Sequence, residues 1–249
     1  MRNFIELSYD GTAYCGWQVQ PNGESVQGCI QRALSMLLRE EVSITGAGRT
    51  DAGVHAAMMV AHVDIPADLS TEATSQLVYR LNGILPHDIA IHKIYPVPDD
   101  MHARFSALAR TYYYYVHTRK SPFLRDRSWR LVHTPDFETM NRAAATLQEY
   151  EDFTSFSKVN TDTKTNICHV RSARWVQLAD YEWRFEITAD RFLRNMVRAI
   201  VGTLMEVGRG RLSIDGFRQV IEQKNRSAAG DSVPARGLFL QAVEYKICG

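Results

Sequence analysis

Strand-like and helix-like segments alternate along this 249-residue chain, and their order limits the possible folds more than any other feature. Ile5, Leu7 and Tyr9 alternate with polar residues, the period of two that is typical of a strand with one buried face. A helix is predicted over 26–38 behind an N-cap at Ser25. The first half further contains a predicted helix over 71–81, ending at Asn82 and Gly83, and predicted strands over 60–65 and 89–95.

The second half has a similar order of elements. We predict strands over 112–116, around Trp175, over 183–187 and over 238–245, and helices from about Asp136, over about 191–207 and from Ser213. This order predicts an α/β or α+β fold in which helices pack on a sheet, arranged as two similar lobes whose sheets could join. The periodicity does not specify how the strands pair.

Composition narrows the class of protein. With 45% hydrophobic and 23% charged residues, the chain is an ordinary globular protein, and disorder as its main state is excluded. No apolar run approaches the roughly 18 residues that span a bilayer, and residues 1–4 resemble a strand rather than a signal peptide. A cytoplasmic protein is expected. Four separated cysteines without C-x-x-C spacing predict reduced thiols rather than a zinc site or a disulfide framework: Cys15, Cys29, Cys168 and Cys248.

A formal net charge of +1 means that any affinity for nucleic acid has to come from local basic patches. Two candidate patches stand out. One is a loop-like stretch with Arg119, Lys120, Arg125, Arg127 and Arg130; the other is a helix with Arg191, Arg194 and Arg198. For both, a solvated basic surface is the alternative to an RNA contact.

Residues 46–56, GAGRTDAGVHA, place a carboxylate and a guanidinium within a glycine-rich bend. Gly46, Gly48 and Gly53 permit sharp turns or a close approach to the backbone, so Asp51 can be presented at a turn. Arg49 could keep that carboxylate ionised or bind a phosphate. From the spacing alone, a tight loop with a surface ion pair is the favoured interpretation, and the other motifs of the chain weigh against it.

Further motifs accompany this one: YDGTAYCGWQVQ over 9–20, HARFSA over 102–107 followed by Arg110-Thr111-Tyr112, FLRNMVRAIVG over 192–202 and GLFL over 237–240. Together, and in this order, they resemble the tRNA pseudouridine synthases of the TruA type over nearly the whole chain. The resemblance implies two ferredoxin-like lobes, 1–105 and 106–249, with a joined, mainly antiparallel sheet, helices on its outer face and an active-site cleft between the lobes.

The resemblance also implies a function: isomerisation of uridine to pseudouridine at positions 38, 39 and 40 of the tRNA anticodon stem-loop, by a cytoplasmic homodimer. This reaction has no net redox change and needs no metal or nucleotide cofactor in principle. Recognition would use tRNA shape and phosphates more than base edges, and the target base would have to leave its stack.

Five residues correspond to the family's site. The resemblance implies that Asp51 is the nucleophile, that Arg198, in the MVR triplet, is its ion-pair partner, and that Arg49 contacts RNA or supports base flipping. It implies that Tyr112 stacks on the target base and that Leu238 forms an apolar wall. Pattern alone also allows Arg198 on a solvated helix face and Leu238 in the core of a strand.

The residues alone leave two other classes of function open. A non-catalytic RNA-binding module would not need Asp51, and a carboxylate-based nucleoside or glycoside hydrolase would need a second positioned carboxylate. Asp10, before Gly11, is better explained as an Asx-type turn cap than as that partner. The histidines lack metalloprotease spacing, and neither a Walker loop nor a dinucleotide fingerprint is present. No substrate contact is assigned in the segment 159–170.

Overall fold

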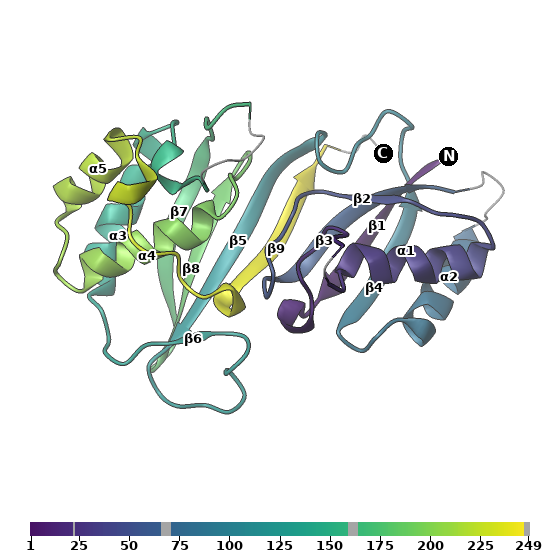
Figure 1. The fold of residues 1–249 in the computed structure, drawn as a ribbon, viewed down its shortest axis with the longest axis horizontal. Coiled ribbons are helices and arrows are strands. Elements are labelled where there is room, and N and C mark those ends of the chain that lie inside the picture. The colour runs from purple at the N-terminus through teal and green to yellow at the C-terminus, as the bar shows by residue number, and fades with distance from the viewer. Residues whose placement is uncertain (22, 66–70, 159–163, 247–249) are drawn as a thin grey trace. The chain divides into compact units, whose positions relative to one another are not determined.

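The computed structural model describes residues 1–21, 23–65, 71–158 and 164–246, and the chain forms two compact units (Figure 1). The first unit comprises Met1–Leu108 and Phe239–Gly249, and the second comprises Ala109–Leu238. Of the segment 159–170, residues 159–163 lie outside the described residues. No helix in the described ranges is long and apolar enough to cross a membrane.

The first unit is built on mostly antiparallel strands. Strand β1 (Arg2–Tyr9) lies between β3 (His55–Asp64) and β4 (Ile89–Pro96) and is antiparallel to both. The short β2 (Ile44–Gly46) adds to β3, and β9 (Leu238–Tyr245) runs parallel to the start of β3. Helix α1 (Val26–Leu38) packs against α2 (Thr71–Ile84) and β2, and α2 packs against β4.

Local signals account for most of these bounds. Phe4, Ile5 and Leu7 of β1 are fully buried, and Ser25 caps α1 by accepting a hydrogen bond from the Gly28 N–H. The predicted end of the second helix at Asn82 and Gly83 is wrong, because α2 continues to Ile84. The Asn82 side chain exchanges two hydrogen bonds of 2.8 Å with the Ile91 backbone, so it joins α2 to β4 and does not end the helix.

The second unit has the antiparallel order β5 (Ala107–His117), β8 (Glu182–Ala189) and β7 (Val170–Ala179), with β6 (Trp129–Arg130) parallel to the end of β5. Its helices are α3 (Phe137–Ala145), α4 (Met196–Gly208) and α5 (Ile214–Glu222). Helix α3 packs on β7, α4 and α5. Short 3-10 turns occupy Gly11–Ala13 in the first unit and Thr146–Glu149, Thr154–Phe156, Arg226–Ala228 and Ala235–Gly237 in the second.

The start predicted for the helix over 191–207 is wrong, because α4 begins at Met196. Asn195 has a left-handed backbone with a φ of 68°, and its side chain donates a hydrogen bond to the Ser232 hydroxyl at 2.6 Å. This conformation breaks the helical path before Met196. Arg191 and Arg194 therefore precede the helix, and the basic helix face predicted from the three arginines is not formed.

The mixed α/β class and the mainly antiparallel strand pairing are confirmed. The short strands β2 and β6 were not predicted, since two or three residues give too little periodicity for a sequence signal. The ferredoxin-like lobes, the joined sheet and the cleft between lobes stay a proposal.

Candidate functional site

Asp51 lies at the first position of a tight turn in the first unit. The Val54 N–H donates to the Asp51 carbonyl at 3.1 Å, and Gly53 at the third position has a φ of 76°. A positive φ at this position alone is the signature of a type II turn, which favours glycine. Asp51 is half-buried and Arg49 is exposed. The glycine-rich bend thus presents the carboxylate as the sequence predicts.

The motif over 9–20 contacts the Asp51 turn and supports its backbone. Gly16 forms an antiparallel bridge with Asp51, and the Trp17 N–H donates to the Thr50 carbonyl at 3.2 Å. The Tyr9 hydroxyl bonds the Thr50 hydroxyl at 2.8 Å in a buried setting. A segment far away in sequence therefore holds Thr50 and the backbone of Asp51, which preorganises the turn.

Two glycines allow this close packing. A Cβ on Gly46 would lie 2.5 Å from the buried Trp17 indole, and a Cβ on Gly11 would lie 2.0 Å from the Val54 carbonyl oxygen. Only glycine lets these surfaces approach so closely. Packing therefore explains part of these sequence motifs. Trp17 and Thr50 support the turn, a role that their sequence positions do not indicate.

Asp10 has the capping role that its position predicts. Its carboxylate accepts hydrogen bonds from the Thr12 N–H at 3.0 Å and from the Thr12 hydroxyl, so it caps the 3-10 turn. The same carboxylate lies 3.2 Å from Nδ1 of the buried His55, which also accepts a hydrogen bond from the Gly11 N–H. His55 stacks on Phe239 of β9 with ring centroids 4.4 Å apart. These contacts fix the start of β3 directly after the Asp51 turn.

Gly16→Ala is expected to destabilise the protein, because Gly16 has a φ of 113° and an added Cβ would lie 2.4 Å from the Thr50 carbonyl oxygen. The backbone strain alone should lower the free energy of unfolding by about 1 to 3 kcal/mol, and the clash adds to it. Gly48→Ala is the matched control, since no atom lies within 4 Å of its added Cβ. Urea denaturation of both variants measures the difference; equal stabilities would contradict the proposed support.

In the second unit, the four tyrosines of β5 alternate between two faces, as the period of two of a strand requires. Tyr113 and Tyr115 share one face, with ring centroids 6.3 Å apart, and the Arg184 guanidinium lies 4.1 Å from the Tyr113 ring centroid. Tyr112 and Tyr114 share the other face. Tyr114 is fully buried, whereas Tyr112 is half-buried and packs edge-on against Phe192 at 5.1 Å. Tyr112 is thus the accessible member of its face.

Tyr114 connects the predicted site residues of this unit. Its hydroxyl donates to the Pro234 carbonyl at 2.8 Å, and a Cβ on Gly237 would lie 2.7 Å from its ring. Burial raises the pKa of Tyr114, while the nearby charges of Arg198 and Arg236 oppose that shift. Tyr114 therefore lies near Arg198 and packs on the residue before Leu238.

Arg198 is anchored by the backbone of a distant segment. Its Nε–H donates to the Val233 carbonyl at 2.8 Å, and the Val233 N–H donates to the Arg198 carbonyl at 3.3 Å. This pair of bonds joins α4 to the segment that leads into β9 and orients the guanidinium. Nothing in the sequence indicates Val233 as a partner, because 35 residues separate the two positions.

Leu238 is 6% exposed and begins β9. Its neighbour Gly237 packs against Tyr114, so the start of the GLFL segment is held at β5 within the second unit. Burial of Leu238 fits both a core leucine and an apolar wall.

Of the predicted site residues, Asp51 and Arg49 belong to the first unit and Tyr112, Arg198 and Leu238 to the second. The pairing of Asp51 with Arg198 stays a prediction.

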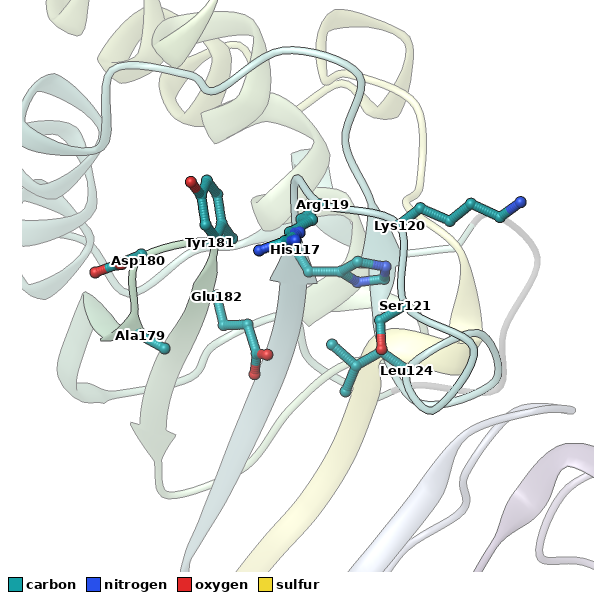
Figure 2. Close-up of a pocket in the computed structure, with 9 residues that line it drawn as sticks. All are labelled: His117, Arg119, Lys120, Ser121, Leu124, Ala179, Asp180, Tyr181 and Glu182. Carbon is teal, nitrogen blue, oxygen red and sulfur yellow. The ribbon is translucent and has the colours of Figure 1, made fainter.

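The basic stretch 119–130 is a loop that ends in β6. All five of its predicted cations are exposed, and Arg125 pairs with Asp126 at 2.7 Å. A pocket of about 550 Å³ lies between this loop and the turn joining β7 to β8, as Figure 2 shows. Arg119 and Lys120 line it beside Asp180 and Glu182. The mixed charge of this pocket does not favour an anion, and RNA contact by the loop stays a prediction.

The exposed His169 is expected to make the stability of the protein depend on pH. Hydrogen bonding to Asp190, with an Nδ1 to Oδ2 distance of 2.9 Å, raises the pKa of His169 above 6.5. A group whose pKa is raised on folding stabilises below its unfolded pKa, and this contribution disappears as the pH rises through its folded pKa. His169→Ala should therefore reduce the loss of Tm between pH 6.5 and pH 8. The same fall in Tm between pH 6.5 and pH 8 in the variant and in the wild type would contradict this contribution of His169.

Within the described ranges, no group of three or more His, Cys, Asp or Glu side chains is arranged to hold a metal ion. The printed contacts of this turn are those of its backbone and of the Thr50 hydroxyl, which bonds the Tyr9 phenol. Such an arrangement can present one carboxylate to a substrate. It suits nucleophilic or proton-transfer chemistry at that carboxylate.

Comparison with known proteins gives a consistent result over the chain. A family model described as tRNA pseudouridine synthase matches residues 7–106 and 143–246. A curated protein named tRNA pseudouridine synthase A from Bacteroides thetaiotaomicron is 57% identical, covering 98% of this chain and 90% of its own length. Proteins of the same name from Porphyromonas gingivalis and Acetivibrio thermocellus are 55% and 41% identical, covering 98% of this chain and 97% and 100% of their own lengths.

Proposed function

This chain belongs to the tRNA pseudouridine synthase family, and we propose that it isomerises uridine to pseudouridine at positions 38, 39 and 40 of the tRNA anticodon stem-loop. The observation that carries the proposal is the Asp51 turn, an intact GRTDAG segment in which Asp51 is half-buried and the 9–20 motif holds the backbone of Thr50 and Asp51. Nearly full-length similarity to proteins named tRNA pseudouridine synthase A supports pseudouridine formation in tRNA.

The reaction breaks the bond from C1′ to N1, rotates the uracil and joins C5 to C1′. The proton on C5 leaves and N1 regains one, so atoms and electrons balance without an oxidant or a reductant. Attack at C1′, addition to C6 and removal of the 2′ proton all require a carboxylate in one position. We assign that role to Asp51, with nucleophilic attack as the leading route.

The other site residues would serve this carboxylate and the base. A carboxylate enclosed against a nucleobase needs a cation partner to stay ionised, and we assign Arg198 to that role because Val233 already orients its guanidinium. Tyr112 is accessible enough to stack on the target base, and Leu238 would bound the base on its apolar side. Arg49 is exposed and would contact the RNA or fill the space left by the flipped nucleotide.

Recognition of a folded tRNA would use its phosphates. The exposed cations of 119–130 provide such contacts within a chain of net charge +1. A homodimer, in which one tRNA contacts both subunits, would increase the basic surface available. We place this activity in the cytoplasm and assign it no cofactor.

The test is site-by-site pseudouridine mapping of an unmodified tRNA transcript incubated with the purified protein, without added metal or nucleotide. Product at positions 38 to 40 is the expected result. Free uracil without pseudouridine would indicate a hydrolase. Binding of tRNA without any product would indicate a non-catalytic RNA-binding module, and product at other positions would overturn the assigned target.

A further inference from the structure

A turn at residues 102–106 of the first unit is rigid yet presents an aromatic ring to solvent. The His102 carbonyl accepts a hydrogen bond from the Ser106 N–H at 2.9 Å, and the Ser106 hydroxyl accepts one from the His102 N–H at 2.9 Å. The His102 ring accepts from the N–H groups of Arg104 and Phe105 at 3.1 and 3.3 Å. The backbone is thus held by its own side chains, while Phe105 is 76% exposed.

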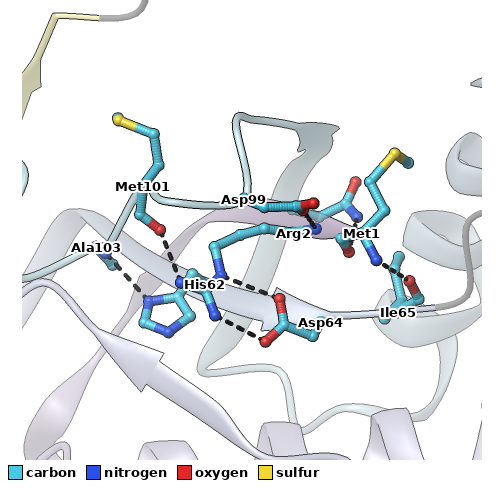
Figure 3. A network of polar contacts seen from close by, with 9 residues as sticks. Met1, Arg2, His62, Asp64, Ile65, Asp99, Met101 and Ala103 are labelled. Carbon is cyan, nitrogen blue, oxygen red and sulfur yellow. Dashed lines mark hydrogen bonds and ion pairs between the residues drawn. The ribbon is translucent and has the colours of Figure 1, made fainter.

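The base of this turn is fixed to the strands by a network of polar contacts (Figure 3). The Arg2 guanidinium forms two hydrogen bonds with the Asp64 carboxylate, at 3.0 and 2.8 Å, and a third with the Met101 carbonyl at 3.1 Å. The Ala103 N–H donates to the His62 ring at 3.1 Å, and the Tyr245 hydroxyl donates to the Ala103 carbonyl. These bonds tie β1, β3 and β9 to the start of the turn.

Three aromatic rings form a column that ends at the surface. His62 is buried and meets His102 edge-on at 4.6 Å, and His102 packs on Phe105 at 4.4 Å. Burial lowers the pKa of His62 to about 4 and also lowers the pKa of His102, so both rings are neutral near pH 7. The two histidine rings therefore pack below Phe105 without adding positive charge there.

A cation accompanies the exposed ring. Arg104 is exposed, and its guanidinium carbon lies 5.6 Å from the Phe105 ring centroid. An immobilised aromatic ring beside an arginine is the combination that proteins use for unpaired nucleobases, because the base stacks on the ring and the guanidinium binds a phosphate. Since the ring is already ordered, binding costs little conformational entropy.

We propose that Phe105 and Arg104 form a second RNA contact, where an unpaired base of the substrate stacks on Phe105 and an adjacent phosphate binds Arg104. The inference rests on the proposed function for its substrate. His62 lies seven residues along β3 from His55, which follows the Asp51 turn. At ~3.3 Å per residue, this is a separation on the order of 20 Å. Only a folded RNA, rather than a single nucleotide, could reach both places.

The test measures binding of an unmodified full-length tRNA transcript at several salt concentrations. Phe105→Ala should raise Kd by about 5- to 150-fold, the range of one stacked base, with no change in salt dependence. Phe105→Trp should keep wild-type affinity and give a larger fluorescence change on RNA addition than the wild type, whose four tryptophans set the background. Arg104→Gln should lower the slope of log Kd against log salt by about 1, the contribution of one phosphate contact.

Tyr79→Ala is the matched control, since Tyr79 is a 78% exposed aromatic on α2 outside this turn. It should bind like the wild type. A Kd for Phe105→Ala within twofold of wild type, at unchanged Tm, would overturn the inference and leave the ring available to a protein partner. Pseudouridine mapping of the wild type in parallel distinguishes failure of this contact from failure of the proposed function. If the wild type forms pseudouridine and Phe105→Ala binds tRNA normally, only the contact is refuted. If the wild type forms no pseudouridine, the proposed function is refuted.

Discussion

Asp51→Asn is expected to reduce pseudouridine formation by at least ~10³-fold, because asparagine can neither attack carbon nor accept the transferred proton. Its side chain has nearly the same shape as aspartate. The Gly16 bridge and the hydrogen bond from Val54 involve the backbone of residue 51, so the turn should persist. The measurement is single-turnover pseudouridine formation on an unmodified tRNA transcript at saturating enzyme.

Binding and stability separate a chemical role from a structural one. Asp51→Asn should bind tRNA with a Kd within about threefold of wild type and unfold at the same urea concentration, since only the chemistry is removed. Gly83→Ala, on α2 outside this loop, is the control that should remain active, since no atom lies within 4 Å of its added Cβ. Activity of Asp51→Asn within tenfold of wild type would refute the catalytic assignment.

Arg198→Gln is expected to lower the single-turnover rate by about 10²-fold with little change in tRNA affinity. Loss of one preorganised charge partner in an enclosed site typically has an effect of this size. Arg198→Lys keeps the positive charge but loses the planar Nε–H that donates to the Val233 carbonyl at 2.8 Å. An intermediate rate for the lysine variant is therefore expected.

The comparison of the two variants distinguishes charge from anchoring. If both lose the same activity and the same stability, the bond to Val233 accounts for the effect, and the ion pair with Asp51 is refuted. Arg194→Gln is the matched control, because Arg194 is an exposed arginine of the same motif that precedes α4. Its rate should stay within twofold of wild type.

Much of the fold follows from local sequence patterns. The N-cap at Ser25, the helix starts near Asp136 and Ser213 and the strand over 238–245 were indicated by the sequence, and all three residues cap their helices. These signals are reliable because the bonds that carry them join residues three or fewer positions apart. The glycine-rich turn at Asp51 was predicted for the same reason: Gly53 supplies the positive φ within the turn itself.

The errors share a physical cause. Asn82 was interpreted as a helix end, yet its amide bonds Ile91 in the neighbouring strand. The helix over 191–207 was predicted to begin too early because apolar spacing does not show that Asn195 bonds Ser232, 37 residues away, in a left-handed conformation. In each case a side chain that favours a local conformation obtained a distant partner instead.

The sequence by itself determined the family and the order of the longer elements, and it led to Asp51 as the proposed carboxylate, because motifs and short-range hydrogen bonds depend on residues that are close in the chain. Tertiary structure alone decided how the carboxylate is supported and how Arg198 is oriented. Gly16 meets Asp51, Trp17 packs on Gly46, and Arg198 bonds Val233 only after folding. Such contacts depend on the closeness of packed surfaces, which the spacing of residues in one sequence does not encode.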